Sequence, residues 1–221
     1  MAELAASTRA AGAAADATRR VVLATRSAGK LRELGPMLAT AGWTALTLDD
    51  VGVAEDPAEV GIEAFDTFEA NALAKAHWFF ARAGGLPVLA DDSGLALDAL
   101  GGRPGVQSKF FAGRRDLHGA ALDAANNAAL VAALRTAATR RGGYVCVMAW
   151  VDAAGAFTVR GETTGTLIDT PRGTGGFGYD PHFVSDDLGK TFGEASAAEK
   201  SRVSHRGRAV AALLGRLSDR R

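Results

Sequence analysis

Hydrophobic and polar positions along the chain follow two periods, one typical of strands and one typical of helices. Residues 21–25 are almost all apolar, which predicts a buried strand. Leucines at 31, 34 and 38 then recur at helical spacing, so a helix is predicted over 30–41. Short apolar runs at 44–48 and 86–90 predict two more strands.

The rest of the chain continues this mixture. A long helix is predicted over 65–83, a second one around Leu122–Leu134, and a last one on which Val210, Leu213, Leu214 and Leu217 share a face. Three runs, GYVCVMAWV, AFTVRGE and TTGTLI, have strand character. Segments rich in glycine, proline or charge are predicted loops: 49–64, 101–117 and 171–183. This order predicts a mixed α/β fold, with an elongated central mixed sheet flanked by helices.

Composition indicates one domain with a sizeable core. The chain has 221 residues, 48% of them hydrophobic, and 25 basic side chains balance 25 acidic ones. A neutral chain gives no general reason to expect a nucleic-acid or membrane surface, and no apolar run is long enough to span a membrane. We predict a single domain over 21–221, preceded by a flexible alanine-rich extension over 1–20 that lacks the apolar region of a secretory signal.

A lone cysteine, Cys146, lies inside the apolar run YVCVMAW. One cysteine cannot form a disulfide within the chain, and a reducing compartment is compatible with it. We interpret Cys146 as a buried strand residue and not as a nucleophile, because its neighbours are apolar.

The first predicted strand runs into a loop of small residues that ends in Gly29-Lys30. A Walker loop needs an earlier glycine and a Ser or Thr directly after the lysine, whereas this chain has Ala24 and Leu31 at those places. The sequence argues against a Walker loop but keeps what an anion needs, namely free N–H groups at a helix start and a lysine. A plain strand-to-helix turn capped by Ser27 is the structural alternative.

Two adjacent carboxylates, Asp91 and Asp92, follow the apolar run 86–90 and precede Ser93. We expect the strand to end here and a turn to begin. Adjacent side chains of an extended segment point to opposite faces, so only one carboxylate is expected to face a given site. A carboxylate at a strand end can hold magnesium, polarise water or do both, and the alternative is a cap of the turn.

The segment GTGGFGYDPHF, residues 173–183, carries Phe177, Tyr179 and Asp180 on a glycine-rich loop. An exposed aromatic ring there would stack on a planar base, and the carboxylate would accept ring N–H groups. The alternative is a turn with its aromatic side chain in the core.

The segment EKSRVSHRGRA, residues 199–209, places Lys200, His205 and Arg206 at the start of the last predicted helix. Cations at a helix start oppose the helix dipole, so helix stability does not explain them. They would suit an anionic or carbonyl-rich ligand, and the alternative is a solvated basic face.

Five stretches, in this order, resemble those of the inosine/xanthosine triphosphate pyrophosphatase family: LATRSAGKLREL, FEANALAKA, ADDSGLALDALGGRPGVQSKFFAG, GTGGFGYDPHF and EKSRVSHRGRA. The resemblance implies a cytoplasmic homodimer that hydrolyses noncanonical purine nucleoside triphosphates (ITP, dITP and XTP) to the monophosphate and pyrophosphate with Mg²⁺. It also implies two lobes with the nucleotide in a cleft between them.

The resemblance further implies roles for single residues. Asp92 would hold the metal and activate the attacking water, which makes it the catalytic residue. The triphosphate would be bound by residues of the first loop, namely Thr25, Arg26, Ser27, Ala28, Gly29 and Lys30. Ser93 would also contact the substrate, and the base would be held by Phe177, Gly178, Tyr179, Asp180, Lys200, His205 and Arg206.

Two positions depart from the family's pattern. The family's helix motif often has a glutamate that assists the metal where this chain has Ala70. Glu69 is a poor replacement, because on a helix it lies about 160° away from Asn71. The second departure is Lys109, where the family commonly has arginine, so charge is kept but bidentate geometry is lost.

Three alternatives stay open on the sequence alone. A Maf-like nucleotide pyrophosphatase would have a related fold and another base preference. A non-catalytic nucleotide sensor would account for the missing glutamate at position 70. A kinase or P-loop ATPase fits least well, for the reasons given for the first loop.

Overall fold

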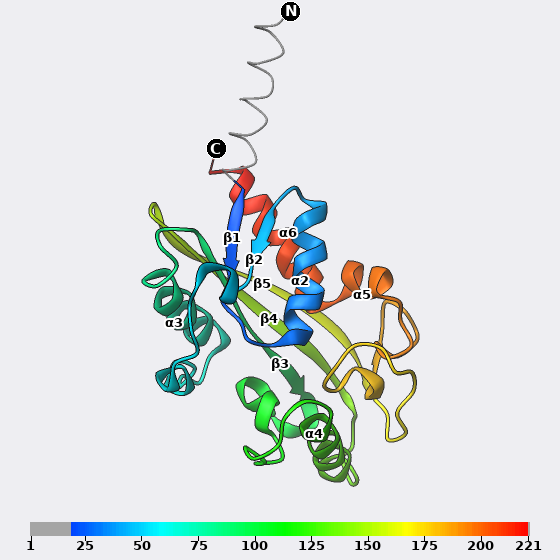
Figure 1. The fold of residues 1–221 in the computed structure, drawn as a ribbon. Coiled ribbons are helices and arrows are strands. Elements are labelled where there is room, and N and C mark those ends of the chain that lie inside the picture. Colours follow the sequence, from blue (N-terminus) through cyan, green and yellow to red (C-terminus); the bar gives the residue numbers. More distant parts are fainter. Residues whose placement is uncertain (1–18, 221) are drawn as a thin grey trace, which may run out of the picture.

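The computed structural model describes residues 19–220, and within them the chain builds a six-stranded sheet in the order β2-β1-β3-β4-β5-β6 (Figure 1). β1 (Arg20–Leu23) pairs in parallel with β2 (Thr44–Leu46) and β3 (Val88–Leu97). The strands that complete the sheet join antiparallel; they are β4 (Arg141–Asp152), β5 (Gly155–Leu167) and β6 (Phe183–Ser185). The predicted mixed α/β fold is confirmed, whereas the predicted extension over 1–20 lies almost wholly outside the described residues.

Helices cover both faces of this sheet (Figure 1). Their bounds are α2 (Ala28–Thr40), α3 (Phe68–Phe80), α4 (Gly119–Ala133), α5 (Ala197–Val203) and α6 (His205–Ser218). Short 3₁₀ turns lie in the connections, at Asp49–Val51, Pro57–Gly61, Asp98–Leu100, Gly105–Phe110 and Asp180–His182. None of the described helices is both long and apolar enough to cross a membrane.

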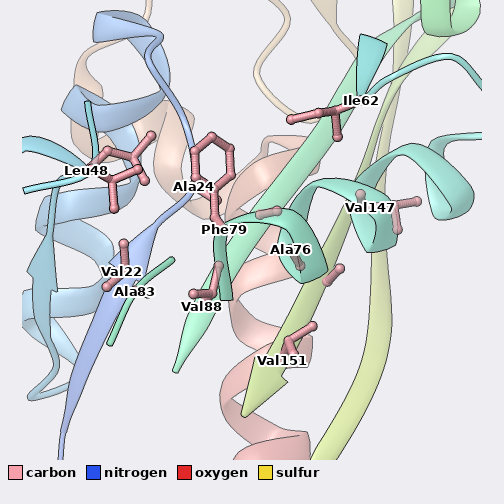
Figure 2. Packing of buried hydrophobic residues seen from close by; sticks show 14 of the residues in the cluster. Val22, Ala24, Leu48, Ile62, Ala76, Phe79, Ala83, Val88, Val147 and Val151 are labelled. Atoms are coloured by element: carbon pink, nitrogen blue, oxygen red, sulfur yellow. The ribbon is translucent and has the colours of Figure 1, made fainter. Parts of the chain in front are cut away.

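Strict alternation along the central strands builds two cores, one on each face of the sheet. In β4, Val147 packs towards α3 in a cluster that includes Ala76 and Phe79 (Figure 2), whereas Met148 packs on the opposite face. That opposite cluster contains Leu34 of α2 and residues of α6. Successive side chains of β3 and β4 point to opposite faces of the sheet, so alternate positions pack against different helices.

A third core fills the other end of the sheet. It contains Leu95 and Leu97 of β3, Leu130 of α4, and the aromatic residues Tyr144 and Phe183. β3 thus passes from the first two cores, at Val88–Ala90, into the third core. The polar residues Asp91, Asp92 and Ser93 lie on the stretch between these cores, which is where a site can open without breaking any core.

Three sequence predictions need correction. β3 does not end at residue 90 but continues to Leu97, because the polar residues keep their ladder pairing with β4: Asp91 with Met148 and Asp92 with Val147. AFTVRGE and TTGTLI form one strand, β5, and not two.

The last predicted helix is divided at Ser204, whose extended backbone ends α5 and begins α6. The Ser204 hydroxyl accepts the Gly207 N–H, and Gly207 lies so close to the Ser201 carbonyl that a side chain there would clash. Lys200 and Arg206, predicted at one helix start, therefore lie on two helices.

Candidate active site

The first loop connects β1 to α2 and begins the helix with a hydroxyl cap. The Ser27 Oγ atom accepts the backbone N–H of Lys30 at 3.4 Å, and the Thr25 hydroxyl accepts the N–H of Ser27 at 3.1 Å. At Gly29 a Cβ atom would lie 2.8 Å from the Phe177 ring, so only glycine fits. The Lys30 ammonium reaches Asp91, at 3.1 Å from both its carbonyl oxygen and its Oδ1 atom. The Lys30 side chain is thus directed to β3. The cap at Ser27, which the sequence analysis gave as the structural alternative, is present as well.

Arg26, predicted as a phosphate-loop residue, has its guanidinium turned to a different segment. It donates to the Glu59 carboxylate at 2.8 Å and to the Val53 carbonyl at 3.1 Å. The ion pair with Glu59 holds the segment 53–61 against the first loop. The Arg26 side chain therefore positions a neighbouring loop in this structure.

Asp91 and Asp92 point to opposite faces of β3, as their adjacency predicts. The Asp91 carboxylate is fully buried and meets Lys30 of α2 and Arg206 of α6, with a distance of 3.3 Å from the guanidinium to Oδ2. Burial alone would raise the pKa of Asp91, but these cations outweigh it and hold the pKa well below its usual value. Asp91 is therefore a permanent anion that ties the first loop to the last helix.

Asp92 faces α3 and makes no ion pair within the described residues. It is 8% exposed, and its Oδ2 atom accepts the Asn71 amide at 3.0 Å, while Oδ1 accepts the backbone N–H of Ser93 at 3.0 Å. Burial raises the pKa of Asp92, against the opposing pull of Lys30 and Lys75. A half-satisfied carboxylate of this kind can accept a proton from water or bind a cation.

Glu63, which the sequence analysis did not select, brings a second carboxylate to this face. It pairs with the ammonium of Lys75, a buried residue of α3 that also donates to the Asp91 carbonyl at 2.6 Å. The charge of Glu63 contributes to the raised pKa of Asp92, which shows that the two carboxylates share one electrostatic environment. Asp92 and Glu63 are two candidate oxygen donors, and no group of three or more potential ligands occurs in the described part of the chain.

Such a pair fits magnesium better than a metal that needs a full protein cage. Mg²⁺ in nucleotide enzymes is bound through one or two carboxylates and completes its shell with water and phosphate oxygens. Glu69, by contrast, forms an exposed ion pair with Arg160 at 2.7 Å, so its exclusion from the metal set agrees with its geometry. Lys109 lies over the Phe110 ring, 5.1 Å from its centroid.

The predicted base-side cations form a closed ion-pair cluster. Lys200 pairs with Glu33 at 2.6 Å and with Asp180, and Arg206 pairs with Glu33 as well as with Asp91. Arg206 is only 2% exposed and also donates to the Ser93 hydroxyl at 2.8 Å. Glu33 is a further residue that the sequence analysis missed, although it lies one helical turn after Lys30.

The aromatic residues of the segment 173–183 differ in their exposure. Phe177 is half-buried, and its ring centroid lies 5.3 Å from the Lys200 ammonium. Tyr179 is buried in the third core and donates its hydroxyl to the Ser108 carbonyl at 2.7 Å, which matches the core alternative for that ring. Asp180 accepts the backbone N–H of Phe177 at 2.8 Å, so the loop is closed on itself.

His205 is buried and stacks on Tyr144, with ring centroids 4.6 Å apart and an interplanar angle of 11°. Burial, together with the charges of Arg206 and Lys200, holds the pKa of His205 well below its usual value. The ring is therefore neutral at physiological pH and acts here as a flat packing partner beside the cations.

A comparison with protein-family models shows the family of the chain: residues 21–216 match the model of the Ham1 family. The chain belongs to the Ham1 family. It is 48% identical to a dITP/XTP pyrophosphatase of Ralstonia nicotianae over 202 residues, which cover 90% of this chain and 96% of that relative. It is 45% identical to a protein of the same name from Thermus thermophilus, over 90% of this chain and 92% of the relative.

Solved structures agree with this assignment. The Ham1 protein of Staphylococcus aureus superposes with a TM-score of 0.75 at 30% identity, covering 91% of this chain and all of the other. A nucleoside-triphosphatase, dITP/XTP pyrophosphatase, of Mycobacterium abscessus is 40% identical with a TM-score of 0.66, over 88% of this chain and 98% of that one. Membership in the Ham1 family thus holds for sequence and fold alike.

Proposed function

We propose that this Ham1 family member hydrolyses noncanonical purine nucleoside triphosphates, with ITP, dITP and XTP as substrates, to the monophosphate and pyrophosphate. One observation carries the proposal: β3 places Asp91, which joins Lys30 of the first loop to Arg206 of the last helix, next in sequence to Asp92, which makes no ion pair among the described residues. Phosphate-side and base-side groups therefore meet at Asp91, and the adjacent position of the same strand carries the candidate general base. The names of the relatives, dITP/XTP pyrophosphatase, support the same substrate class.

Asp92 accepts the proton of the water that attacks the α-phosphorus, as its position and raised pKa suit a general base. The backbone N–H groups of Ala28 and Gly29, at the start of α2, and the Lys30 ammonium bind the phosphate oxygens and stabilise the charge that develops on them. Asp92 and Glu63 would hold Mg²⁺, which supplies positive charge at the phosphates and lowers the pKa of bound water. Lys75 keeps Glu63 ionised and in place.

Base choice follows from hydrogen-bond complementarity. The 6-oxo group of hypoxanthine or xanthine is assigned to the side of Arg206 and Lys200, which are buried and ion-paired, so it meets an N–H donor there by replacing one of their present partners. Adenine has an amino donor at the same place, so donors would oppose donors and stay unpaired. Guanine shares the 6-oxo group but has a 2-amino donor where xanthine has a 2-oxo acceptor of similar size, so its rejection rests on hydrogen-bond polarity and not on size.

A panel of nucleotides tests the proposal, with pyrophosphate and monophosphate measured separately. We expect pyrophosphate release from dITP, ITP and XTP with Mg²⁺, and much lower kcat/KM for dGTP and dATP. Equal values across the panel would refute the selectivity, orthophosphate release would indicate another reaction, and nucleotide binding without turnover would indicate a sensor. A homodimer in the cytoplasm is part of the proposal and rests on the family resemblance.

A further inference from the structure

Helix α4 makes hydrogen bonds to the backbone of Gly178 in the base-side loop. The Asp123 Oδ2 atom accepts the Gly178 N–H at 2.9 Å, and the Asn127 amide donates to the Gly178 carbonyl at 3.0 Å. Asp123 and Asn127 are four residues apart and so lie on one face of the helix. Both hydrogen-bonding groups of Gly178 are thus held by α4.

Gly178 is the residue whose backbone sets the direction of its neighbours. Its φ angle of +63° lies in the left-handed region, which glycine adopts without strain. Directly before it, Phe177 packs on Gly29 of the first loop, and two residues after it Asp180 pairs with Lys200. A change in the backbone angles at Gly178 would therefore displace the Phe177 ring and the Asp180 carboxylate together.

Helix stability does not explain Asp123 and Asn127. The rest of α4 is rich in alanine and leucine, and Asp and Asn are poorer helix formers than either. The Oδ1 atom of Asn127 is buried and has no hydrogen-bond partner among the described residues, which is itself unfavourable. Only the contact with Gly178 compensates for this cost.

We propose that Asp123 and Asn127 are positioning residues that clamp the Gly178 peptide and thereby fix the geometry of the base-side loop. The clamp sets KM and the discrimination between purine bases, while the chemical step depends on Asp92 at a different place. This inference rests on the proposed function, because it assigns the 177–180 loop to the base. Neither residue touches Lys200, Arg206 or Asp92 in the structure.

Asp123→Ala and Asn127→Ala test the clamp, with Asp123→Asn as the conservative variant and Asn126→Ala as the matched control. Asn126 is the neighbouring asparagine on α4, but its side chain holds the Lys109 carbonyl and the Ala112 N–H instead. We expect the two clamp variants to lower kcat/KM for dITP about tenfold, the size of one net hydrogen bond, with most of the change in KM. Their preference for dITP over dGTP should shrink as well.

The amide oxygen of Asp123→Asn still accepts the Gly178 N–H, so this variant should restore both KM and base preference. Asn126→Ala should lower the melting temperature yet keep the preference for dITP over dGTP. Unchanged KM and preference in both clamp variants would overturn the proposal, as would an Asp123→Asn variant as impaired as Asp123→Ala.

Hydrogen–deuterium exchange of the loop tests, independently of an activity assay, whether Asp123 and Asn127 hold the backbone at Gly178. Exchange at Phe177 and Gly178 should rise in both clamp variants and stay at the wild-type level in Asn126→Ala, and equal exchange in all of them would overturn the clamp. A wild-type chain that releases no pyrophosphate from dITP would instead refute the proposed function, and the exchange result would still stand.

Discussion

The phosphate side and the base side of the candidate site use the same kinds of residue but balance their charges differently. On the base side, two cations meet two carboxylates: Lys200 and Arg206 with Glu33 and Asp180. On the phosphate side, two ammonium groups meet three carboxylates: Lys30 and Lys75 with Glu63, Asp91 and Asp92. Arg206 also pairs with Asp91 and so joins the two sides, and among the described residues of this set Asp92 is the carboxylate without an ion pair.

This difference matches the ligands that the two sides would bind. A purine base is neutral. A base side whose charges are balanced can offer hydrogen-bond donors to it without binding ions from solution. A triphosphate arrives with a divalent cation, so a side that has one carboxylate in excess has room for that cation. Within the phosphate side, the lowered pKa of Asp91 and the raised pKa of Asp92 distinguish the ion-paired carboxylate from the one in excess.

Asp92→Asn gives the largest expected effect on the phosphate side. Loss of the general base should lower kcat by about 10² to 10⁴. The melting temperature should fall only slightly, because the amide keeps one of the two accepting oxygens and no ion pair of Asp92 is lost among the described residues. Steady-state kinetics and thermal unfolding measure the two effects.

Asp91→Asn is the matched control, since it removes the neighbouring carboxylate that holds Lys30 and Arg206. That variant should unfold at clearly lower temperature. Near-wild-type turnover of Asp92→Asn, or equal thermal stability of the two variants, would contradict the assignment of Asp92 to catalysis and of Asp91 to stability.

Glu33→Ala breaks the balance on the base side. It leaves Lys200 and Arg206 with one carboxylate partner fewer each, and removal of one member of a buried ion cluster typically destabilises by about 3 kcal/mol. The free energy of unfolding from urea titration measures this loss. Glu69→Gln, which breaks the exposed pair with Arg160, should change it by less than about 0.5 kcal/mol. Equal losses in both variants would show that burial of the cluster does not matter.

Glu63→Gln tests whether the phosphate side holds the metal with two carboxylates. We expect about tenfold weaker metal binding, since loss of a ligand or its orienting partner has effects of this size. Mn²⁺ binding followed by electron paramagnetic resonance and the Mg²⁺ dependence of kcat measure it. Glu69→Gln again serves as the control, and wild-type metal affinity in Glu63→Gln would leave Asp92 as the only protein carboxylate on the metal.

Local pattern predicted most of the fold but not the partners within the site. The apolar run 21–25 and the leucine spacing that follows it are properties of neighbouring residues, and both gave the right element. The strand β3 was predicted too short, because Asp91 and Asp92 resemble the start of a turn. Their role as strand residues depends on pairing with β4, more than 50 positions later.

Glu33, Glu63 and Lys75 were missed for a related reason. Each is a single charged residue within an ordinary helix or loop, and its importance comes from partners far away in the sequence, such as Arg206 for Glu33. A weak signal existed in two cases. Glu33 lies one turn after Lys30, and Lys75 shares a helix face with Asn71, so each could have been placed beside a residue already selected.

The smallest expected effect is the pH dependence of the stability that Glu33 contributes to the base side. Burial by itself would raise the pKa of Glu33, but the charges of Arg206 and Lys200 outweigh burial and bring it below its usual value. A carboxyl group whose pKa is lower in the folded protein stabilises the fold above its unfolded pKa of about 4.3, and this stabilisation is lost as pH falls through the folded pKa.

The difference in unfolding free energy between the wild-type chain and Glu33→Gln should therefore shrink by at most about 0.6 kcal/mol when the pH falls from 6 to 4, measured by urea titration. A difference that stays constant with pH would mean that Glu33 stabilises the base side by packing alone. The closed charge balance, which distinguishes that side from the phosphate side, would then have no energetic role.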